Sequence, residues 1–312
     1  MIVSRRIYYL NHDYPRPSGG IRVIYRQVEL LRQRGFEATV VQRLRGYRPS
    51  WFTSEAPVEC LDDIRPSATD FVVIPENYRH GARLFGGTAP AKIVFCQNHH
   101  YVFRGFAANR TWRRWCSDVV CVSTPIRDYL RRAFGINDAP LWPCFVDRTL
   151  FRPRPKRLQI CYMPRKRPEE AKFIRESFAA MYPGLRSIPW VRIDGLPERE
   201  VARIMGESAI FLALGRHEGL GLPPLEAMAS ACQVVGFSAG GGAEYASPEN
   251  GRWVDEGDLV SCVDALAQTL KEYEHGTVLP AVEKTLSTYS RKRADQALVE
   301  YWVERMATAP VN

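Results

Sequence analysis

The sequence predicts an α/β protein that contains two doubly wound parallel-sheet domains. The chain has 312 residues, which suits two domains of roughly 150 residues each. In both halves, short β-rich runs alternate with helical patterns, and this alternation predicts a parallel sheet with helices on both faces. A segment rich in proline separates the halves. The composition, 46% hydrophobic and 25% charged, is that of a globular protein and excludes disordered and collagen-like chains.

The first half opens with a strand and a helix. Apolar residues at helical spacing from Ile21 to Leu31 predict the helix, and Gly35 provides its C-terminal stop. Pro125 begins a second, amphipathic helix that runs to Phe134, since proline is well tolerated at the first helical position. Strands are expected at five β-rich runs, residues 5–11, 37–44, 70–76, 91–98 and 118–123.

The second half repeats this scheme with a different sequence. Strands are expected at residues 159–164, 190–195, 209–215, 233–237 and 251–255. Helical patterns lie between them, at residues 168–181, 197–206 and 223–231, and the tail from 258 to 306 is helical by the same criterion.

Prolines at positions 140, 143, 153 and 155 mark the boundary between the halves, because proline discourages regular backbone pairing. We predict a first Rossmann-like domain over residues 1–143, a linker over 144–157 and a second Rossmann-like domain over 158–290. Residues 291–312 are expected to form a helix that packs back on the first domain. Ligands of such sheets bind beyond the carboxyl ends of the strands, so we expect the site in a central cleft that the domains face.

The excess positive charge lies in the first half. Residues 1–150 contain 22 Lys and Arg against 13 Asp and Glu, whereas residues 151–312 contain 21 of each. This asymmetry indicates an anionic partner such as a membrane surface, a phosphorylated molecule or nucleic acid, with a merely solvated surface as the alternative. The candidate contacts are Arg104, Arg110, Arg113, Arg114, Arg127, Arg131 and Arg132, with Trp112 and Trp115 among them.

The sequence predicts a cytoplasmic location. The basic first half adds the alternative that the protein associates peripherally with the inner face of a membrane. Arg5 and Arg6 lie where a signal peptide would need apolar residues, and no apolar run approaches the ~20 residues that span a bilayer. The eight cysteines form no C-x-x-C pair, so buried reduced thiols are expected and no metal site is predicted.

The most informative segment is residues 215–254. The strand at 209–215 delivers a glycine-rich loop at its carboxyl end, and Pro223 then starts a helix whose N-terminal N–H groups favour an anion. Glu218 on the loop and Glu226 in the first helical turn can face a ligand from two sides; a capping pair on a solvated loop is the alternative. A second glycine-rich turn, at 238–245, includes Gly241 and could also approach a phosphate. Two such turns indicate a nucleotide diphosphate.

Several motifs, in the same order along the chain, resemble those of family 4 glycosyltransferases, which are retaining enzymes of the GT-B fold. The run from Glu218 to Glu226 resembles the E-x(7)-E signature of that family. Further matches are Gly240–Gly242 with Glu244, Asn250-Gly251 with Val254, the V-D-R-T-L-F-R-P segment at 146–153, and Gly19-Gly20-Ile21 before the first helix. The resemblance therefore covers most of the chain.

The resemblance implies roles for the glycine-rich loops and the two glutamates. Glu218 would contact the transferred sugar, and Glu226 would contact the ribose of the nucleotide. The backbone amides of Gly219, Leu220 and Gly221 would hold sugar hydroxyls, and those near Gly19 and Gly20 would hold the diphosphate.

Two basic residues are expected to neutralise the leaving diphosphate. The family usually has a G-R-x(n)-K-G pattern after the first strand of its second domain, whereas this chain has M-P-R-K-R-P at 163–168. Arg165 takes the place of the motif arginine, and Lys166 or Arg167 could serve as the second cation. Their charges would stabilise the departing phosphate electrostatically.

The first half is expected to supply the acceptor side. Gln97-Asn98-His99-His100 ends a strand at the edge where ligands bind, so His99 or His100 could polarise an acceptor hydroxyl; the sequence does not choose between them. No D-x-D motif occurs in the chain, which favours a metal-independent reaction. No cofactor is expected besides the nucleotide-sugar co-substrate, whose base stays open among UDP, GDP and dTDP.

We interpret the chain as a retaining glycosyltransferase that moves a sugar from a nucleotide-diphosphate donor to a glycan or lipid-linked acceptor in polysaccharide or glycoconjugate biosynthesis. One alternative keeps this chemistry and makes a modified DNA base the acceptor. Another is a nucleotide-sugar epimerase or a degenerate glycan-binding module. A Rossmann dehydrogenase is disfavoured, since no G-x-G-x-x-G follows either first strand.

Overall fold

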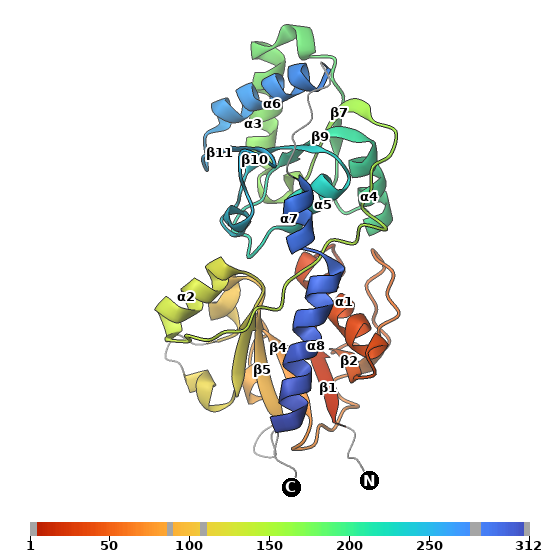
Figure 1. Cartoon of the computed structure of the whole chain (residues 1–312), viewed down its shortest axis with the longest axis vertical. Coiled ribbons are helices and arrows are strands. Elements are labelled where there is room, and N and C mark those ends of the chain that lie inside the picture. Colours follow the sequence, from red (N-terminus) through yellow and green to blue (C-terminus); the bar gives the residue numbers. More distant parts are fainter. Residues whose placement is uncertain (1–4, 86–89, 107–110, 275–281, 309–312) are drawn as a thin grey trace. The chain divides into compact units, whose positions relative to one another are not determined.

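The protein consists of two compact α/β units, each built on a parallel sheet (Figure 1). The computed structural model describes residues 5–85, 90–106, 111–274 and 282–308. Unit 1 comprises residues 1–144 and 292–312, and unit 2 comprises residues 145–291. The predicted fold class, two doubly wound parallel-sheet α/β domains, is confirmed.

The sheet of unit 1 has six parallel strands in the order β3-β2-β1-β4-β5-β6. The sequence predicted five of them and missed β3, a three-residue edge strand with one buried side chain, which is too short for a periodic pattern. The strands are β1 (Arg6–Leu10), β2 (Glu37–Gln42), β3 (Val58–Cys60), β4 (Phe71–Pro75), β5 (Ala91–Cys96) and β6 (Asp118–Cys121).

Two helices of unit 1 follow the predicted apolar spacing. Helix α1 (Gly19–Gln33) buries Ile21, Ile24, Val28 and Leu31 against the sheet. Helix α2 (Thr124–Phe134) begins with proline in its first turn and ends at Gly135, whose φ of 66° lets its N–H group cap the carbonyl of Arg131. Both helices therefore end where the sequence places their stop signals.

Helix α8 (Arg291–Thr308), near the C-terminal end of the chain, packs on the sheet of unit 1 (Figure 1). Its Trp302 is fully buried, and its ring lies 5.2 Å from that of Phe71 and 5.8 Å from that of Trp142. The Trp302 indole N–H donates to the Tyr9 hydroxyl at 3.3 Å, so the buried polar group is satisfied. The C-terminal helix is thus part of the core of unit 1.

The sheet of unit 2 has five parallel strands in the order β11-β10-β9-β7-β8. Its strands and its helices all fall within predicted segments, with small differences at their ends. The strands are β7 (Arg157–Tyr162), β8 (Trp190–Arg192), β9 (Ser208–Ala213), β10 (Gln233–Phe237) and β11 (Arg252–Val254). The helices are α3 (Pro168–Met181), α4 (Glu198–Glu207), α5 (Leu222–Ala229), α6 (Leu259–Glu274) and α7 (Val282–Thr288).

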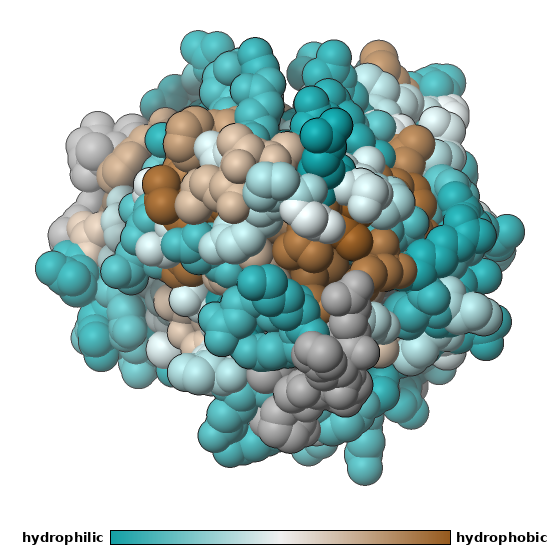
Figure 2. Space-filling view, turned by 90° about the horizontal axis from the view of Figure 1, so that it is seen from above, coloured by the Kyte–Doolittle hydropathy of each residue, from teal (hydrophilic) through white to brown (hydrophobic). Residues whose placement is uncertain are grey.

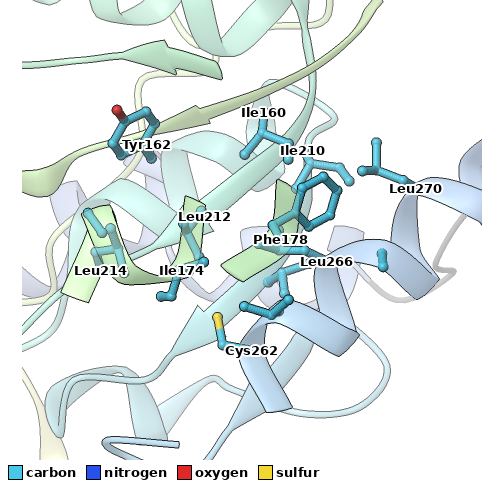
Figure 3. Close-up of a cluster of buried hydrophobic side chains, with 14 of the residues drawn as sticks. Ile160, Tyr162, Ile174, Phe178, Ile210, Leu212, Leu214, Cys262, Leu266 and Leu270 are labelled. Atoms are coloured by element: carbon cyan, nitrogen blue, oxygen red, sulfur yellow. The ribbon is translucent and has the colours of Figure 1, made fainter. Parts of the chain in front are cut away.

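The core of unit 2 lies where α3 and α6 pack on the sheet (Figure 3). Ile174 and Phe178 of α3 meet Leu266 of α6 over Ile210 of β9, and all four side chains are buried. Three large apolar side chains on these helices remain exposed, Phe173, Met181 and Val260. Figure 2, which views the molecule from above, shows such apolar areas interrupted by hydrophilic residues, as is normal for a protein surface.

Residues 145–156, all of them described, form neither helix nor strand and belong to unit 2. At their end, the Lys156 ammonium donates to the carbonyls of Met205, Ser208 and Ser230, at 3.2, 2.8 and 2.5 Å. These carbonyls lie at the C-terminal ends of α4 and α5, where a cation is favourable. Burial lowers the pKa of Lys156.

Seven of the eight cysteines are buried, and Cys116 is half-buried. Among the described helices, none combines the length and the apolar character that a membrane crossing requires.

Candidate active site

Two loops of unit 2 pair with each other at the carboxyl edge of the sheet. The Glu218 N–H group, in the loop after β9, donates to the Ala239 carbonyl at 3.0 Å, and the Gly241 N–H group donates back to the Glu218 carbonyl at 3.1 Å. The two glycine-rich turns that the sequence singled out therefore lie side by side. His217 and Ala239 hold positive φ angles of 52° and 58°, an unusual conformation for residues other than glycine that is concentrated at functional sites.

Glycine is required where these loops cross. A Cβ atom on Gly241 would lie 2.4 Å from the carbonyl carbon of Gly219, a distance that no side chain tolerates. Gly221, with a φ of 87°, directly precedes α5, and a left-handed residue costs little only when it is glycine. Gly241 thus allows the two loops to approach each other closely, and Gly221 allows the chain to turn directly into α5.

A pocket of about 540 Å³ lies at this edge of the sheet. It brings together Glu218 and Gly221 from the loop after β9 with Arg165 and Lys166, which follow β7. The turn after β10 closes it. The remaining lining residues are Met163, Phe211, Ala213, Leu214, Gly215, Pro223, Pro224, Phe237, Ser238, Ala239 and Tyr245.

Lys166 and Glu218 form an ion pair in the pocket. Lys166 Nζ lies 2.7 Å from Glu218 Oε1 and donates to the Arg216 carbonyl at 3.1 Å. Both side chains are about a quarter exposed, so an incoming ligand can reach each of them. Arg165 is exposed beside them and makes no hydrogen bond or ion pair with another described residue.

Arg167, the other candidate for the second cation, has a structural position instead. Its side chain is only 4% exposed, and it forms ion pairs with Glu170 and Glu256. Its Nε donates to the Gly215 carbonyl at 2.8 Å, and its guanidinium lies over the Phe237 ring. Because its charge is already neutralised by two carboxylates, Lys166 is the residue that the structure offers to a ligand.

Glu226 lies one residue beyond the first turn of α5, because the helix begins at Leu222 and not at Pro223. The expectation that it lies in the first turn is therefore wrong by one residue. Its side chain is buried, 4% exposed, and is not among the residues that line the pocket.

Tyr245 is a site residue that the sequence analysis missed. It lines the pocket, and its hydroxyl donates to the Gly221 carbonyl at 2.7 Å, directly before α5. Burial raises the pKa of this phenol, and electrostatic interactions with Tyr289, Glu218 and Glu226 raise it further. The available signal was its position at the end of the second glycine-rich turn, immediately after Glu244.

Asn250 holds the same turn in place through its hydrogen bonds. Its buried amide donates to the Tyr245 carbonyl at 2.6 Å and to the Thr285 hydroxyl at 2.9 Å. Its Oδ1 atom accepts from the Ser247 N–H group and from the Trp253 indole, each at 3.0 Å. The Asn-Gly motif found in the sequence therefore holds the loop in place.

In unit 1, Gly19 and Gly20 are the first residues of α1. The Gln97 side-chain amide, which follows β5, donates to the Gly20 carbonyl at 3.2 Å. A Cβ atom on Gly20 would lie 3.4 Å from that amide, an ordinary van der Waals contact, so this approach of α1 to the end of β5 does not by itself require glycine.

His99 and His100 lie in a 3₁₀ helix over His99–Arg104, after β5. His99 is half-buried, its ring lies 4.9 Å from that of Tyr129, and its Nδ1 has no partner among the described residues. Burial, with a smaller effect of His100, lowers the pKa of His99 to about 4, so its imidazole is neutral at pH 7. His100 is exposed.

The basic surface predicted for the first half is present in part. Trp112 is buried, 5% exposed, between Phe106 and Phe134, so the prediction that it belongs to this surface is wrong. Trp115 is exposed, and so is Phe103, which the sequence analysis did not name. Arg110 lies outside the described residues. The other arginines of the surface are exposed or half-exposed: Arg104, Arg113, Arg114, Arg127, Arg131 and Arg132.

Comparisons with known proteins indicate the class of this protein. Residues 165–272, which contain every pocket residue after Met163, match the family model described as glycosyl transferases group 1. An α-1,6-glucosyltransferase of Actinobacillus pleuropneumoniae is 28% identical over 283 residues, which cover 86% of this chain and 84% of that protein.

Solved structures share the fold over nearly the whole chain. Sucrose-phosphate synthase from Thermosynechococcus elongatus is similar with a TM-score of 0.74 at 13% identity, covering 97% of this chain and 99% of that one. HepE from Anabaena, solved in complex with UDP-glucose, is similar with a TM-score of 0.68 at 13% identity, covering 96% and 99%. Together with the family match, these similarities support a glycosyltransferase with the GT-B fold.

Proposed function

We propose that the protein is a retaining, family 4-type glycosyltransferase that transfers a glucosyl group from UDP-glucose to a hydroxyl of a glycan or lipid-linked acceptor. The observation that carries this proposal is the unit 2 pocket, in which Arg165, Lys166 and Glu218 meet a glycine-rich helix entry. The name of the 28% identical relative and the UDP-glucose bound to HepE support the choice of donor.

In this proposal the pocket residues divide between the two ends of the donor. Arg165 and Lys166 bind the diphosphate, for which a guanidinium and an ammonium are suited. Glu218 accepts hydrogen bonds from the glucosyl hydroxyls, and the backbone of Gly219, Leu220 and Gly221 holds the ring. Glu226, which is buried and does not line the pocket, is assigned to the ribose by resemblance alone. The backbone at Gly19 and Gly20 is assigned to the phosphates by resemblance alone, and that at Gly241 by its place in the second glycine-rich turn.

The ion pair between Lys166 and Glu218 couples these two tasks. At 2.7 Å each charge neutralises the other. A diphosphate that draws the ammonium toward itself leaves the Glu218 carboxylate available to sugar hydroxyls. The pocket therefore needs no extra counter-ion before it accepts the anionic donor, and its two cations take the place of a divalent metal.

In the transfer step, the acceptor hydroxyl forms a bond to C1 of glucose while the bond between C1 and the phosphate oxygen breaks. The hydroxyl proton passes to the leaving UDP, and the new bond keeps the α configuration. Positive charge from Arg165 and Lys166 stabilises the negative charge that develops on the phosphate. The low pKa of His99, about 4, makes its imidazole a weak base, so His99 would act by hydrogen bonding to the acceptor rather than by taking its proton.

The basic surface of unit 1 supports a peripheral membrane site for a lipid-linked acceptor on the cytoplasmic face. Phe103 is 57% exposed and Trp115 is 38% exposed, and in the sequence they adjoin Arg104 and Arg114. Exposed aromatic groups beside cations suit an anionic bilayer surface. We expect the protein to sediment with vesicles that contain phosphatidylglycerol and not with pure phosphatidylcholine; equal binding to both, or to neither, would rule this surface out.

The proposal is tested by a thermal-shift series with UDP, GDP and dTDP and their glucose conjugates, in EDTA. A ligand present at about 100 times its Kd adds about 2.7 kcal/mol of stability. We expect UDP and UDP-glucose to raise the melting temperature. Proton NMR of the reaction with a glucoside acceptor then reports the anomeric configuration. A β-linked product would refute retention, and a complete dependence on added Mg²⁺ would refute a metal-independent reaction.

A further inference from the structure

The order of the strands in unit 1 marks a second position at which a ligand can bind. From β1 the chain proceeds to β2 and β3 on one side and then crosses to β4 on the other. At such a switch point the loops that follow the two central strands diverge, and ligands bind there in doubly wound sheets. In this chain the diverging loops begin with Asn11-His12 after β1 and with Glu76-Asn77 after β4.

The side chains His12 and Asn77 bridge this switch point. His12 Nε2 lies 2.8 Å from Asn77 Oδ1, so a hydrogen bond joins the loop after β1 to the loop after β4. The His12 ring stacks on that of Tyr78, with 5.1 Å between centroids. Both His12 and Asn77 are half-exposed, whereas the flanking Asn11 and Glu76 are buried. The pair is therefore fixed in position and open to a ligand.

Buried polar groups on both sides hold the two loops rigidly. Glu76 Oε2 accepts from the Gln97 N–H group at 3.0 Å, which ties the end of β4 to the end of β5. Asn11 Oδ1 accepts from the His12 N–H group at 2.9 Å. A Cβ atom on Gly105 would lie 2.3 Å from the Glu76 carbonyl oxygen, so a third segment packs tightly beneath. A site whose supporting groups are locked in this way is preorganised for binding.

The chemistry of the pair fits an uncharged, hydroxyl-bearing ligand. An imidazole and a carboxamide together offer both donors and acceptors, which match hydroxyl groups that do both. A phosphate, in contrast, is bound by guanidinium or ammonium groups, and neither belongs to the bridging pair. The pair is also separate from His99, which packs against Tyr129 beyond β5.

We propose that His12 and Asn77 form a saccharide site at the switch point of unit 1, where they hydrogen-bond a ring hydroxyl of the acceptor sugar. The inference rests on the proposed glycosyl transfer, which it extends by naming an acceptor site and its ligand class. Glu76 and Gln97 act here as positioning residues, since they fix the loops without reaching the ligand.

The experiment uses isothermal titration calorimetry of the full chain with two probes, isomaltotriose as the saccharide and UDP as the nucleotide. We expect His12→Ala and Asn77→Ala each to weaken isomaltotriose binding about tenfold and to leave UDP binding unchanged. The double variant should also lose about tenfold, because either single change already breaks the shared pair.

The matched controls are His80→Asn and Asn137→Ala, which remove an exposed imidazole and an exposed amide elsewhere in unit 1. Asparagine suits position 80 because that residue has a left-handed φ of 60°. Both controls should bind isomaltotriose like the wild type. If His12→Ala does not fold, His12→Gln keeps a hydrogen-bonding amide and is titrated in its place, with an expected loss of a few fold.

Two results would overturn the saccharide site. One is wild-type protein that does not bind isomaltotriose, and the other is binding by the His12 and Asn77 variants that equals that of the controls. A hundredfold, additive loss in the double variant would contradict a single shared pair. Failure of UDP to bind the wild type would instead refute the proposed donor, and this outcome is independent of the saccharide measurement.

Discussion

The carboxyl edges of the two sheets differ in the charge of their side chains and in the conformation of their loops. In unit 2 the edge is charged and strained: Lys166 pairs with Glu218, and the loops that meet there need glycine at positions 221 and 241. In unit 1 the switch point of the sheet carries an imidazole and an amide, those of His12 and Asn77, which are bonded to each other. A diphosphate demands positive charge and close backbone approach. A hydroxyl-bearing acceptor demands neither, so the same architecture can carry two chemically distinct edges.

The largest effect is expected from Glu218→Ala. The change removes the carboxylate assigned to the sugar and should lower kcat by about 10³-fold, at the upper end of what one lost electrostatic contact costs. UDP binding should stay within a few fold of the wild type, because the residues proposed to contact the nucleotide are Arg165, Lys166 and Glu226. Steady-state kinetics with UDP-glucose and calorimetry with UDP measure the two quantities.

Glu249→Ala is the matched control, because Glu249 is exposed in the same segment and outside the pocket. Glu226→Ala provides the contrast, since it should weaken UDP binding itself. Equal and mild effects of the Glu218 and Glu226 changes on both quantities would mean that the charged edge of unit 2 is not the donor site.

The sequence reveals the unit 2 edge more fully than the unit 1 edge, for a physical reason. Glycine is required at position 221 by its positive φ and at position 241 by close backbone contact, and Pro223 lies in the first turn of a helix. Each of these requirements restricts the residue type at a fixed position, so the sequence shows it directly. His12 and Asn77 are 65 residues apart and meet only because β1 and β4 are adjacent in the sheet. Single-sequence patterns do not report such a pairing.

The same distinction applies to the elements of the fold. The strands with continuous apolar runs and the helices with regular spacing, such as α2, were predicted within a few residues. Strand β3 has only three residues, and the burial of Trp112 depends on Phe106 and Phe134, which approach it in space. The choice of Lys166 over Arg167 required the positions of Glu170 and Glu256. Local signals were sufficient for the longer helices and strands, and insufficient for a three-residue strand and for the partners of individual side chains.

The second-largest effect is expected from Arg165→Ala. Arg165 is exposed in the pocket and has no carboxylate partner among the described residues, so its charge is available to the donor phosphates. Its loss should lower kcat about 10²-fold. Arg165→Lys should recover part of the rate, since charge is kept while the bidentate geometry is lost.

Arg186→Ala, at an exposed arginine of the same unit, is the control and should retain full activity. A kcat for Arg165→Ala that lies within twofold of this control would show that Lys166 alone supplies the charge at this edge.

The third prediction concerns the stability of the unit 1 edge at different pH values. Burial raises the pKa of Glu76 from its ordinary value of 4.5 to about 7, although backbone N–H groups oppose the shift. The folded state therefore holds a proton that the unfolded state releases, and stability is lost as pH rises from 4.5 to 7. The contribution is on the order of 3 kcal/mol, at 1.36 kcal/mol per pKa unit.

Glu76→Gln removes this titration and keeps an acceptor for the Gln97 N–H group. We expect the variant to gain stability relative to the wild type as pH rises from 4.5 to 7, in urea unfolding followed by circular dichroism. The lowered pKa of His99 makes the free energy of unfolding rise with pH between 4 and 6.5. This effect is the same in both proteins, so it cancels in the difference between them. A difference that stays constant with pH would mean that Glu76 is ionised in the folded protein.

The smallest effect is expected from Tyr245→Phe, which tests whether the unit 2 edge depends on preorganisation as well as on charge. The change deletes the hydrogen bond to the Gly221 carbonyl and keeps the ring packed between Trp253 and Tyr289. One such bond contributes about 1 kcal/mol, so kcat/KM should fall several fold while global stability drops by a similar small amount. Tyr182→Phe, which deletes an exposed hydroxyl bonded to Asp264, is the matched control. If both variants lose stability equally but only Tyr245→Phe loses activity, then the position of Gly221 at the start of α5, and not stability as such, limits the reaction. Equal activity in both variants would leave charge as the sole requirement of this edge.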